Sequence, residues 1–120
     1  MPDAFFRLGI KDEEDFLFLE ADRGTMSTGR FLGKLLAYQA WREQGGFEKK
    51  FDHTHFRVLT VTPSNERRDN LREAAKALGK GGMFWFTSEN YYGLENPQSI
   101  FQKIWVTAKP KDDKTHSLLE

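Results

Sequence analysis

The stretch DFLFLEADRGT, residues 15–25, carries a strong structural signal and an unexplained pair of acids. The apolar run over residues 16–19 predicts a buried strand that continues to residue 22. Strand side chains alternate between faces, so Glu20 and Asp22 leave the same face, about 7 Å apart along the backbone. An arginine and a glycine follow at once, which is typical of a turn. A hydrophobic strand therefore ends in two carboxylates that point the same way.

The segment before this stretch predicts the other half of a hairpin. Residues 4–10 (AFFRLGI) are typical of a first strand, and the charged segment KDEED joins them to the second. In a hairpin the start of one strand lies beside the end of the other. We therefore expect Asp3 to lie near Glu20 and Asp22.

The segment after the stretch predicts a helix over residues 27–44. Ser27 or Thr28 can cap its N-terminus, and two glycines at 45 and 46 end it. This helix leaves the same end of the strand and carries Lys34 and Tyr38. Three acids and one lysine are thus expected at one edge of the sheet.

The rest of the chain predicts a mixed α/β sheet. Residues 55–62 are typical of a strand, and the nearly continuous apolar and β-branched run from Val58 to Val61 favours a central strand covered on both faces. A helix over 64–78, a strand over 82–90 and a strand of poor phase over 99–108 follow. The order strand-strand-helix-strand-helix-strand implies right-handed crossovers and a central sheet with flanking helices on its faces.

The composition limits the class of protein. The chain has 120 residues, and 18 basic groups balance 18 acidic ones, so its net charge steers it toward neither nucleic acid nor an anionic membrane. It has no cysteine, which excludes disulfides and thiolate zinc sites and fits the cytoplasm. No membrane-length apolar run and no signal-peptide pattern occur. We expect no membrane partner, and the sequence indicates no oligomeric state.

The ends of the chain predict one domain with a polar tail. Residues 2–108 form a single α/β domain in this interpretation, and 109–120 form a tail that frays. Leu119 and Glu120 resemble a cloning remnant. The abrupt start at Met1, directly before a strand, suggests a domain cut from a longer protein.

The expected cluster has the chemistry of a divalent-metal site. Mg²⁺ takes oxygen ligands and keeps several waters, and Asp3, Glu20 and Asp22 would supply part of its shell. A bound ion lowers the pKa of a water, and Lys34 would steady the developing charge, as phosphodiester hydrolysis requires. The alternative is that the acids are solvated at strand ends and that Lys34 is a surface lysine.

The order of these motifs resembles the restriction-endonuclease-like superfamily. Its signature is Pro-Asp, then acid-x-Lys, on a strand-strand-helix-strand core. Taken together, PDAFF, FLFLEADRGT, KLLAYQAW, FRVLTVTPSNERRDNLREAA and FWFTSEN are similar to the replication-relaxation family over residues 2 to 105. The resemblance implies a restriction-endonuclease-like core and a DNA-associated domain of a plasmid replication, mobilisation or DNA-relaxation protein. It also implies a winged-helix DNA-binding domain preceding this segment in the parent protein. The carboxylate cluster itself predicts Mg²⁺ or Mn²⁺ as cofactor.

One position departs from the superfamily pattern. Where active nucleases carry lysine, two residues after the acid, this chain has Asp22. Either Lys34 on the helix has taken over that role, with Glu20 as its catalytic partner, or the site has lost catalysis and kept the scaffold as an interaction module. A small α/β enzyme with another site is a third hypothesis. Neither a phosphate-binding glycine loop nor a nucleophile elbow supports it.

Several residues are candidates for contact with DNA. They are Arg23, Arg30, Tyr38, Arg67 and Arg68. For Arg23 a solvated turn is the alternative to a phosphate contact, and a tyrosine such as Tyr38 is more often a core or helix-flank aromatic than a ligand contact.

Three further patterns have a structural and a functional interpretation. The arginines of NERRDNLR, with Arg72 included, are either the solvated start of a helix or a phosphate patch. The histidines of DHTH are more often incidental than metal ligands. MFWFT is more often a core strand than a base-stacking platform.

Overall fold

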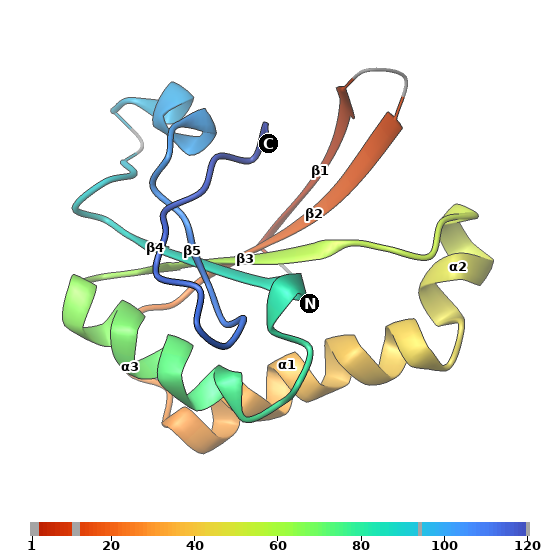
Figure 1. Ribbon diagram of the computed structural model, residues 1–120, viewed down its shortest axis with the longest axis horizontal. Coiled ribbons are helices and arrows are strands. Elements are labelled where there is room, and N and C mark those ends of the chain that lie inside the picture. Colours follow the sequence, from red (N-terminus) through yellow and green to blue (C-terminus); the bar gives the residue numbers. More distant parts are fainter. Residues whose placement is uncertain (1–2, 11–12, 94, 120) are drawn as a thin grey trace.

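The computed structural model describes residues 3–10, 13–93 and 95–119, which form one mixed five-stranded sheet with helices packed on it (Figure 1). The strands lie in the order β1-β2-β3-β4-β5. The first and last pairs are antiparallel, and β2, β3 and β4 are parallel. Their bounds are β1 Ala4–Ile10, β2 Glu13–Ala21, β3 Arg57–Thr62, β4 Phe84–Ser88 and β5 Val106–Thr107.

The two long helices begin where the sequence predicts. Helix α1 spans Thr28–Glu43 and α3 spans Asn65–Lys76. Ser27 Oγ accepts a hydrogen bond from the Arg30 N–H at 3.2 Å, and Ser64 Oγ accepts one from the Arg67 N–H at 3.1 Å. Each serine thus satisfies one of the backbone donors left free at a helix start. No helix in the described part of the chain is long and apolar enough to cross a membrane.

Both long helices lie on the same face of the sheet, which corrects the expectation of helices on its two faces (Figure 1). The strand order explains this arrangement. The chain steps from β2 to β3 to β4 in one direction, and two right-handed crossovers in one direction place both helices on one side. The other face is covered by the 3₁₀ helix η2, Pro97–Phe101, and by the C-terminal segment.

The sheet is therefore buried on both faces. Phe16 and Phe18 of β2 pack against the helices, and Leu17 between them packs on the opposite side. In β3, Val58 belongs to the helix-side core, while Leu59 and Val61 belong to the other. The prediction that residues 55–62 supply a central strand covered on both faces is confirmed, with the strand itself shorter at its start.

Three details differ from the predictions. A short helix α2, Gly46–Phe51, follows the glycines that were expected only to end α1. The strand predicted over 82–90 is preceded by a 3₁₀ turn, η1, Gly81–Met83. The strand predicted over 99–108 is reduced to Val106–Thr107, because residues 97–101 form η2.

The expectation that residues 109–120 fray is wrong for the described part, 109–119. Leu118 is fully buried, and His116 exchanges two backbone hydrogen bonds with Trp105. Asp112 accepts hydrogen bonds from Thr107 Oγ1 at 2.6 Å and from His116 at 2.8 Å. Burial alone would raise the pKa of Asp112, but these contacts and the Lys114 N–H hold it below its ordinary value. The polar side chains of this segment thus find partners within the fold.

Candidate functional site

The predicted acids lie at the end of the sheet where the parallel strands have their C-termini. Glu20 is the penultimate residue of β2 and pairs in register with Thr60 of β3. The turn of residues 22–27 leads from β2 into α1. The carboxyl ends of parallel strands are where ligands most often bind in open α/β sheets.

Glu20 is held by the two residues that the sequence placed beside it. Its Oε2 accepts a hydrogen bond from Lys34 Nζ at 2.8 Å, and its Oε1 accepts one from Tyr38 OH at 2.7 Å. The Glu20 side chain is only 4% exposed. Lys34 and Tyr38 are four residues apart, so successive turns of α1 present both to one carboxylate. The expectation that the helix delivers Lys34 and Tyr38 to this edge is confirmed, whereas their functional roles stay predictions.

The phenol of Tyr38 remains neutral in this setting. Burial raises its pKa well above the ordinary value, and the hydrogen bond and negative charge of Glu20 raise it further. The charge of Asp3 acts in the same direction, so Asp3 belongs to the same electrostatic neighbourhood. Tyr38 is therefore a hydrogen-bond donor to Glu20 rather than a base.

Asp22 is paired with an arginine from the other long helix. Arg67 donates from Nε and a terminal nitrogen to the two Asp22 oxygens, at 2.8 and 3.1 Å, and also donates to the Met26 carbonyl at 2.7 Å. The Asp22 side chain is 3% exposed and that of Arg67 is 18% exposed. The hydrogen bond that Arg67 donates to Asp22 raises the pKa of Arg67 above its usual value. The Arg67 guanidinium thus ties Asp22 and Met26, near the two ends of the 22–27 turn, to α3.

Asp3 fixes the start of β1 to the end of β2. Its Oδ2 accepts a hydrogen bond from the Ala21 N–H at 2.7 Å, and its own N–H donates to the Leu19 carbonyl at 2.9 Å. The hairpin therefore brings Asp3 beside the residue that follows Glu20, as predicted. Its carboxylate contacts backbone there.

Each of the three carboxylates already has a hydrogen-bond partner within the protein. Glu20 is engaged by Lys34 and Tyr38, Asp22 by Arg67, and Asp3 by backbone. Within residues 3–10, 13–93 and 95–119, no group of three or more histidine or acidic side chains is placed to hold a metal ion. Each acid instead has its own donor, and the two most buried ones have a cation each.

Two cavities meet at Glu20 and Lys34. The larger, about 510 Å³, has aromatic walls that include Phe18 and Trp41, with Tyr38 among its polar lining. The smaller, about 140 Å³, is lined by Glu20 and Lys34 together with residues of the turn, including Asp22 and Arg23. An apolar cavity with a few convergent polar groups is the usual form of a ligand site. Glu20 and Lys34 of the predicted cluster thus lie in the lining of both an aromatic cavity and a smaller one of mixed polarity.

The five candidates for DNA contact lie in three kinds of environment. Arg23 and Arg30 are exposed, and no hydrogen bond or ion pair engages either side chain among the described residues. Tyr38 and Arg67 point inward to Glu20 and Asp22. Arg68 is intermediate, because it pairs with Asp69 at 2.9 Å and lies over the Tyr91 ring.

The arginines of NERRDNLR do not form a joint phosphate patch. Arg72 donates from Nε to the Thr107 carbonyl at 2.6 Å and also bonds to the Asp112 carbonyl, so it ties α3 to the C-terminal segment. Arg67 is turned to Asp22. The three side chains therefore serve three separate contacts.

The remaining patterns have structural roles. His53 contacts the Phe51 carbonyl at 3.0 Å, whereas His55 contacts Thr54, so the two histidines have different neighbours. Phe84 and Phe86 of MFWFT are buried in the helix-side core. The core interpretation of MFWFT is confirmed for these two rings.

Sequence reasoning missed the partner of Asp22. Arg67 lies 45 residues away, on a helix face that sequence alone presents as solvated. The spacing Ser64 to Arg67 offered one signal, since it places Arg67 in the first turn of α3, next to the strand ends.

No protein-family model matches the chain, and no curated protein or solved structure is significantly similar to it. The resemblance to the replication-relaxation family therefore stays a prediction, and function is inferred from side-chain geometry.

Proposed function

We propose that this chain is a DNA-associated domain on a nuclease-like scaffold, in which the turn of residues 22–27 contacts the phosphate backbone. In this proposal the acids at the end of β2 hold the turn in place and do not cleave DNA. The observation that carries it is the double attachment of Arg67, to Asp22 and to the Met26 carbonyl. That attachment leaves Arg23 exposed on a turn whose two ends are fixed.

The charges around the turn support a phosphate contact. Asp22 is neutralised by Arg67, and Glu20 by Lys34. Arg23 and Arg30 are exposed, and the first turn of α1 contains Arg30 but no acid. The N-terminus of a helix also carries a partial positive charge that favours phosphate. The side chains of Arg23 and Arg30 thus face solvent, while the negative charges of Glu20 and Asp22 are each balanced by an ion pair.

The element order supports the nuclease-like scaffold. The main elements run strand, strand, helix, strand, helix, strand, as in the core implied by the motif resemblance. In the parent protein implied by that resemblance, a preceding DNA-binding domain would share the contact with DNA. An isolated turn with two arginines gives modest affinity, because non-specific binding grows with the number of neutralised phosphates.

Fluorescence anisotropy with a labelled DNA duplex tests the proposal. The double variant Arg23→Ala/Arg30→Ala is expected to weaken binding by about tenfold or more, since two charged contacts are lost. The matched control is Lys49→Ala/Lys103→Ala, which removes the same charge from exposed positions elsewhere. Equal loss in both double variants would mean that the turn is not the contact.

A metal-dependent nuclease is the second candidate. Two of the three predicted metal ligands, Glu20 and Asp22, line one small cavity together with Lys34. Binding of Mg²⁺ or Mn²⁺ there would require Asp22 to leave Arg67 or Glu20 to leave Lys34. Calorimetry with Mn²⁺ on the wild type and on Glu20→Gln distinguishes the two, because only a true site loses its heat of binding in the variant.

A further inference from the structure

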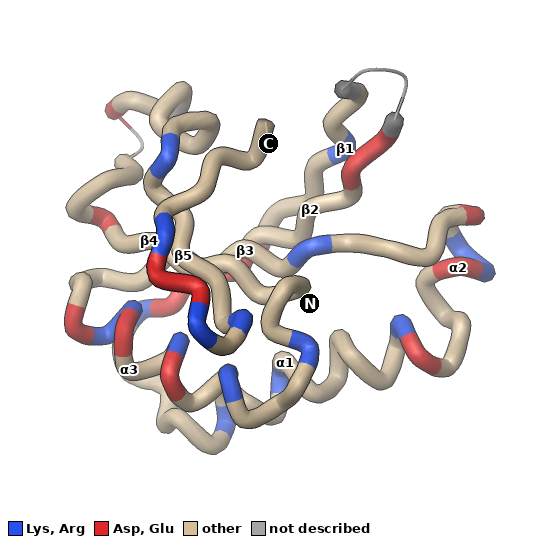
Figure 2. The backbone as a smooth tube through the Cα atoms, in the orientation of Figure 1, with Lys and Arg blue, Asp and Glu red and all other residues tan. Residues whose placement is uncertain are grey.

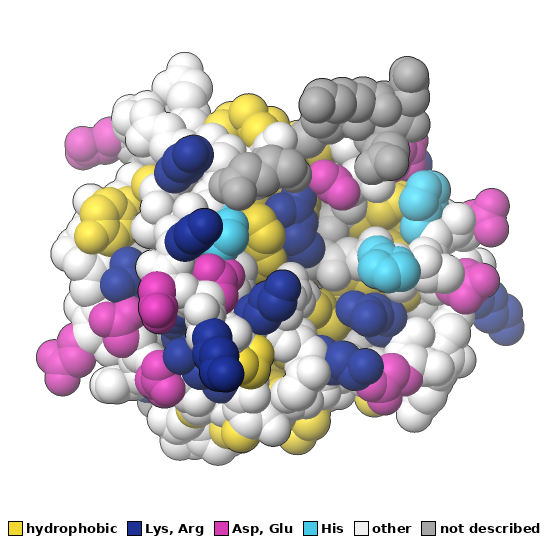
Figure 3. Space-filling model, viewed as in Figure 1, with side chains coloured by type: hydrophobic (Ala, Val, Ile, Leu, Met, Phe, Trp, Pro, Cys, Tyr) yellow, Lys and Arg dark blue, Asp and Glu magenta, His cyan; other side chains and the backbone are white. Residues whose placement is uncertain are grey.

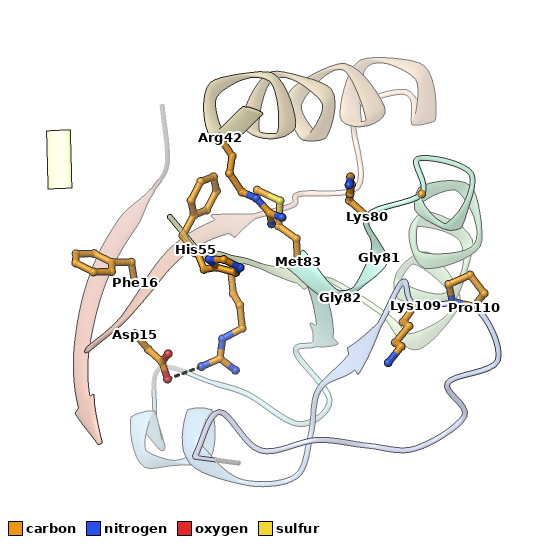
Figure 4. A pocket seen from close by; sticks show the side chains of 13 residues that line it. Asp15, Phe16, Arg42, His55, Lys80, Gly81, Gly82, Met83, Lys109 and Pro110 are labelled. Carbon is orange, nitrogen blue, oxygen red and sulfur yellow. Dashed lines mark hydrogen bonds and ion pairs between the residues drawn. The ribbon is translucent and has the colours of Figure 1, made fainter. Parts of the chain in front are cut away.

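A separate groove lies at the opposite end of the sheet from Glu20, where the parallel strands begin. Its volume is about 640 Å³. The first residues of β3, the end of α1, the loop into η1 and the loop after β5 surround it (Figure 4). Its charged and titratable lining residues are Arg42, Arg57, Lys80, Lys109, His55 and Asp15.

The groove is strongly cationic in a chain of zero net charge. Its single carboxylate, Asp15, accepts a hydrogen bond from Arg57 at 3.1 Å. No hydrogen bond or ion pair involves the side chains of Arg42, Lys80 or Lys109 within the described ranges. Lysine and arginine side chains gather around the hollow in the middle of this face (Figure 3). Clefts lined by charge of one sign concentrate ligands of the other.

The backbone places two of these cations on touching loops. A Cβ added to Gly81 would lie 2.1 Å from the Ala108 carbonyl oxygen, so the two loops are in direct backbone contact. Lys80 and Lys109 are the chain neighbours of these two residues. Arg42 approaches from α1, on the other side of the groove (Figure 4). Three cations from three separate elements therefore face one hollow.

Stabilisation of the helix ends does not account for this group. Arg42 is in the last turn of α1, where a cation complements the helix dipole. Lys80 and Lys109 lie in loops outside the α-helices. Elsewhere on the backbone, charges of both signs are interspersed along α3 (Figure 2). The excess of cations is a local property of the groove.

The base of the groove is apolar, and the contacts of its buried side chains and of Arg57 hold it in place. Phe16, Phe56 and Met83 line it and are buried. Arg57 donates to the Leu118 carbonyl at 3.2 Å and lies over the Trp85 ring at 4.6 Å, in addition to its pair with Asp15. The fixed base and the unpaired cations at its rim suit an anionic ligand.

We propose that this groove binds phosphate groups, of a nucleotide or of a nucleic-acid backbone, through Arg42, Lys80 and Lys109. Arginine can grip a phosphate through two parallel N–H donors, and lysine contributes a compact charge. The proposal does not rest on the DNA contact of the 22–27 turn, which lies at the other edge of the sheet. A free nucleotide would satisfy the groove equally well.

Binding of a fluorescein-labelled oligothymidylate, with ATP as competitor, and direct calorimetric titration with ATP together test this proposal. The double variant Lys80→Ala/Lys109→Ala is expected to bind roughly tenfold or more weakly, whereas Lys49→Ala/Lys103→Ala binds as the wild type does. For a single strand, loss of two phosphate contacts also lowers the slope of log affinity against log salt by about 1.4. The four lysines are exposed, so both variants should fold, and thermal melting checks this.

The outcomes separate the two phosphate sources. Loss of oligothymidylate binding in the groove variant, with little competition by ATP, assigns the groove to a nucleic-acid backbone. Loss of ATP binding in that variant, with no oligothymidylate binding by the wild type, assigns it to a nucleotide. The proposal is overturned if the wild type binds neither probe at about 50 mM salt, or if both double variants weaken equally. If DNA binding is lost in Arg23→Ala/Arg30→Ala while the groove variant binds both DNA and ATP as the wild type does, the groove proposal fails and the proposed function stands.

Discussion

Replacement of Arg67 by methionine should destabilise the protein far more than the same change at its neighbour Arg68. Arg67 makes three hydrogen bonds, two to Asp22 and one to the Met26 carbonyl, and its removal leaves a carboxylate that is 3% exposed without a counter-charge. Breaking a buried ion pair in this way costs about 3–5 kcal/mol. Because Arg67 itself reaches solvent, the lower end of that range, about 3 kcal/mol, is expected.

Arg68→Met is the matched control, since it lies on the same helix and has the same change in side chain. Arginine and methionine have nearly equal helix propensity, so neither variant weakens α3 by itself. Arg68 pairs with Asp69, whose side chain is 53% exposed, and loss of such a pair costs at most about 1 kcal/mol.

Urea unfolding followed by circular dichroism measures both variants. At about 4 °C per kcal/mol for a chain of this size, Arg67→Met should also melt roughly 12 °C below the wild type. The reasoning also predicts that Asp22→Asn, added to Arg67→Met, recovers stability, because the buried charge is gone. Equal free energies of unfolding for Arg67→Met and Arg68→Met would refute the account of the 22–27 turn.

Three further predictions concern single contacts. Tyr38→Phe should cost about 1 kcal/mol through the lost bond to Glu20. In an ultraviolet titration it should leave the absorbance change near the ordinary tyrosine pKa of about 10 as it is in the wild type, because Tyr38 does not ionise there; a smaller change in the variant would contradict the raised pKa of Tyr38. The folded-state pKa of Asp112 is lowered, so its contribution is present above the ordinary pKa of about 3.9 and is lost as pH falls through the folded value; acid unfolding of Asp112→Asn should lack that component. Gly81→Ala should destabilise by about 1–3 kcal/mol because its Cβ would meet backbone, whereas Gly82→Ala, with nothing within 4 Å, should not; equal melting temperatures would show that the two loops do not touch.

The sequence predicted those features that depend on interactions between residues close together in the chain. Ser27 and Ser64 predicted the starts of the two long helices, because capping depends on the residue and its next turn. The hairpin and the spacing of Lys34 and Tyr38 predicted their approach to Glu20, because strand and helix periods fix which side chains share a face.

The features that the sequence did not predict depend on contacts between distant segments. An arginine that pairs with a buried acid has the same sequence pattern as a solvated one, so the Arg67–Asp22 contact was invisible. The polar segment after residue 108 was expected to fray, yet Leu118 is buried against the sheet. The cationic groove was also missed, because its cations come from four separate segments of the chain.

The central claim is that Glu20 and Asp22 hold a DNA-contacting turn and do not cleave DNA. A plasmid assay in Mg²⁺ and in Mn²⁺ tests it most directly, with the wild type, Glu20→Gln and Lys34→Ala compared at low salt. We expect the wild type to bind supercoiled plasmid and to leave it uncut, because the carboxylates are engaged by Lys34, Tyr38 and Arg67. Metal-dependent nicking or relaxation by the wild type that disappears in Glu20→Gln and in Lys34→Ala would contradict the claim and establish the nuclease.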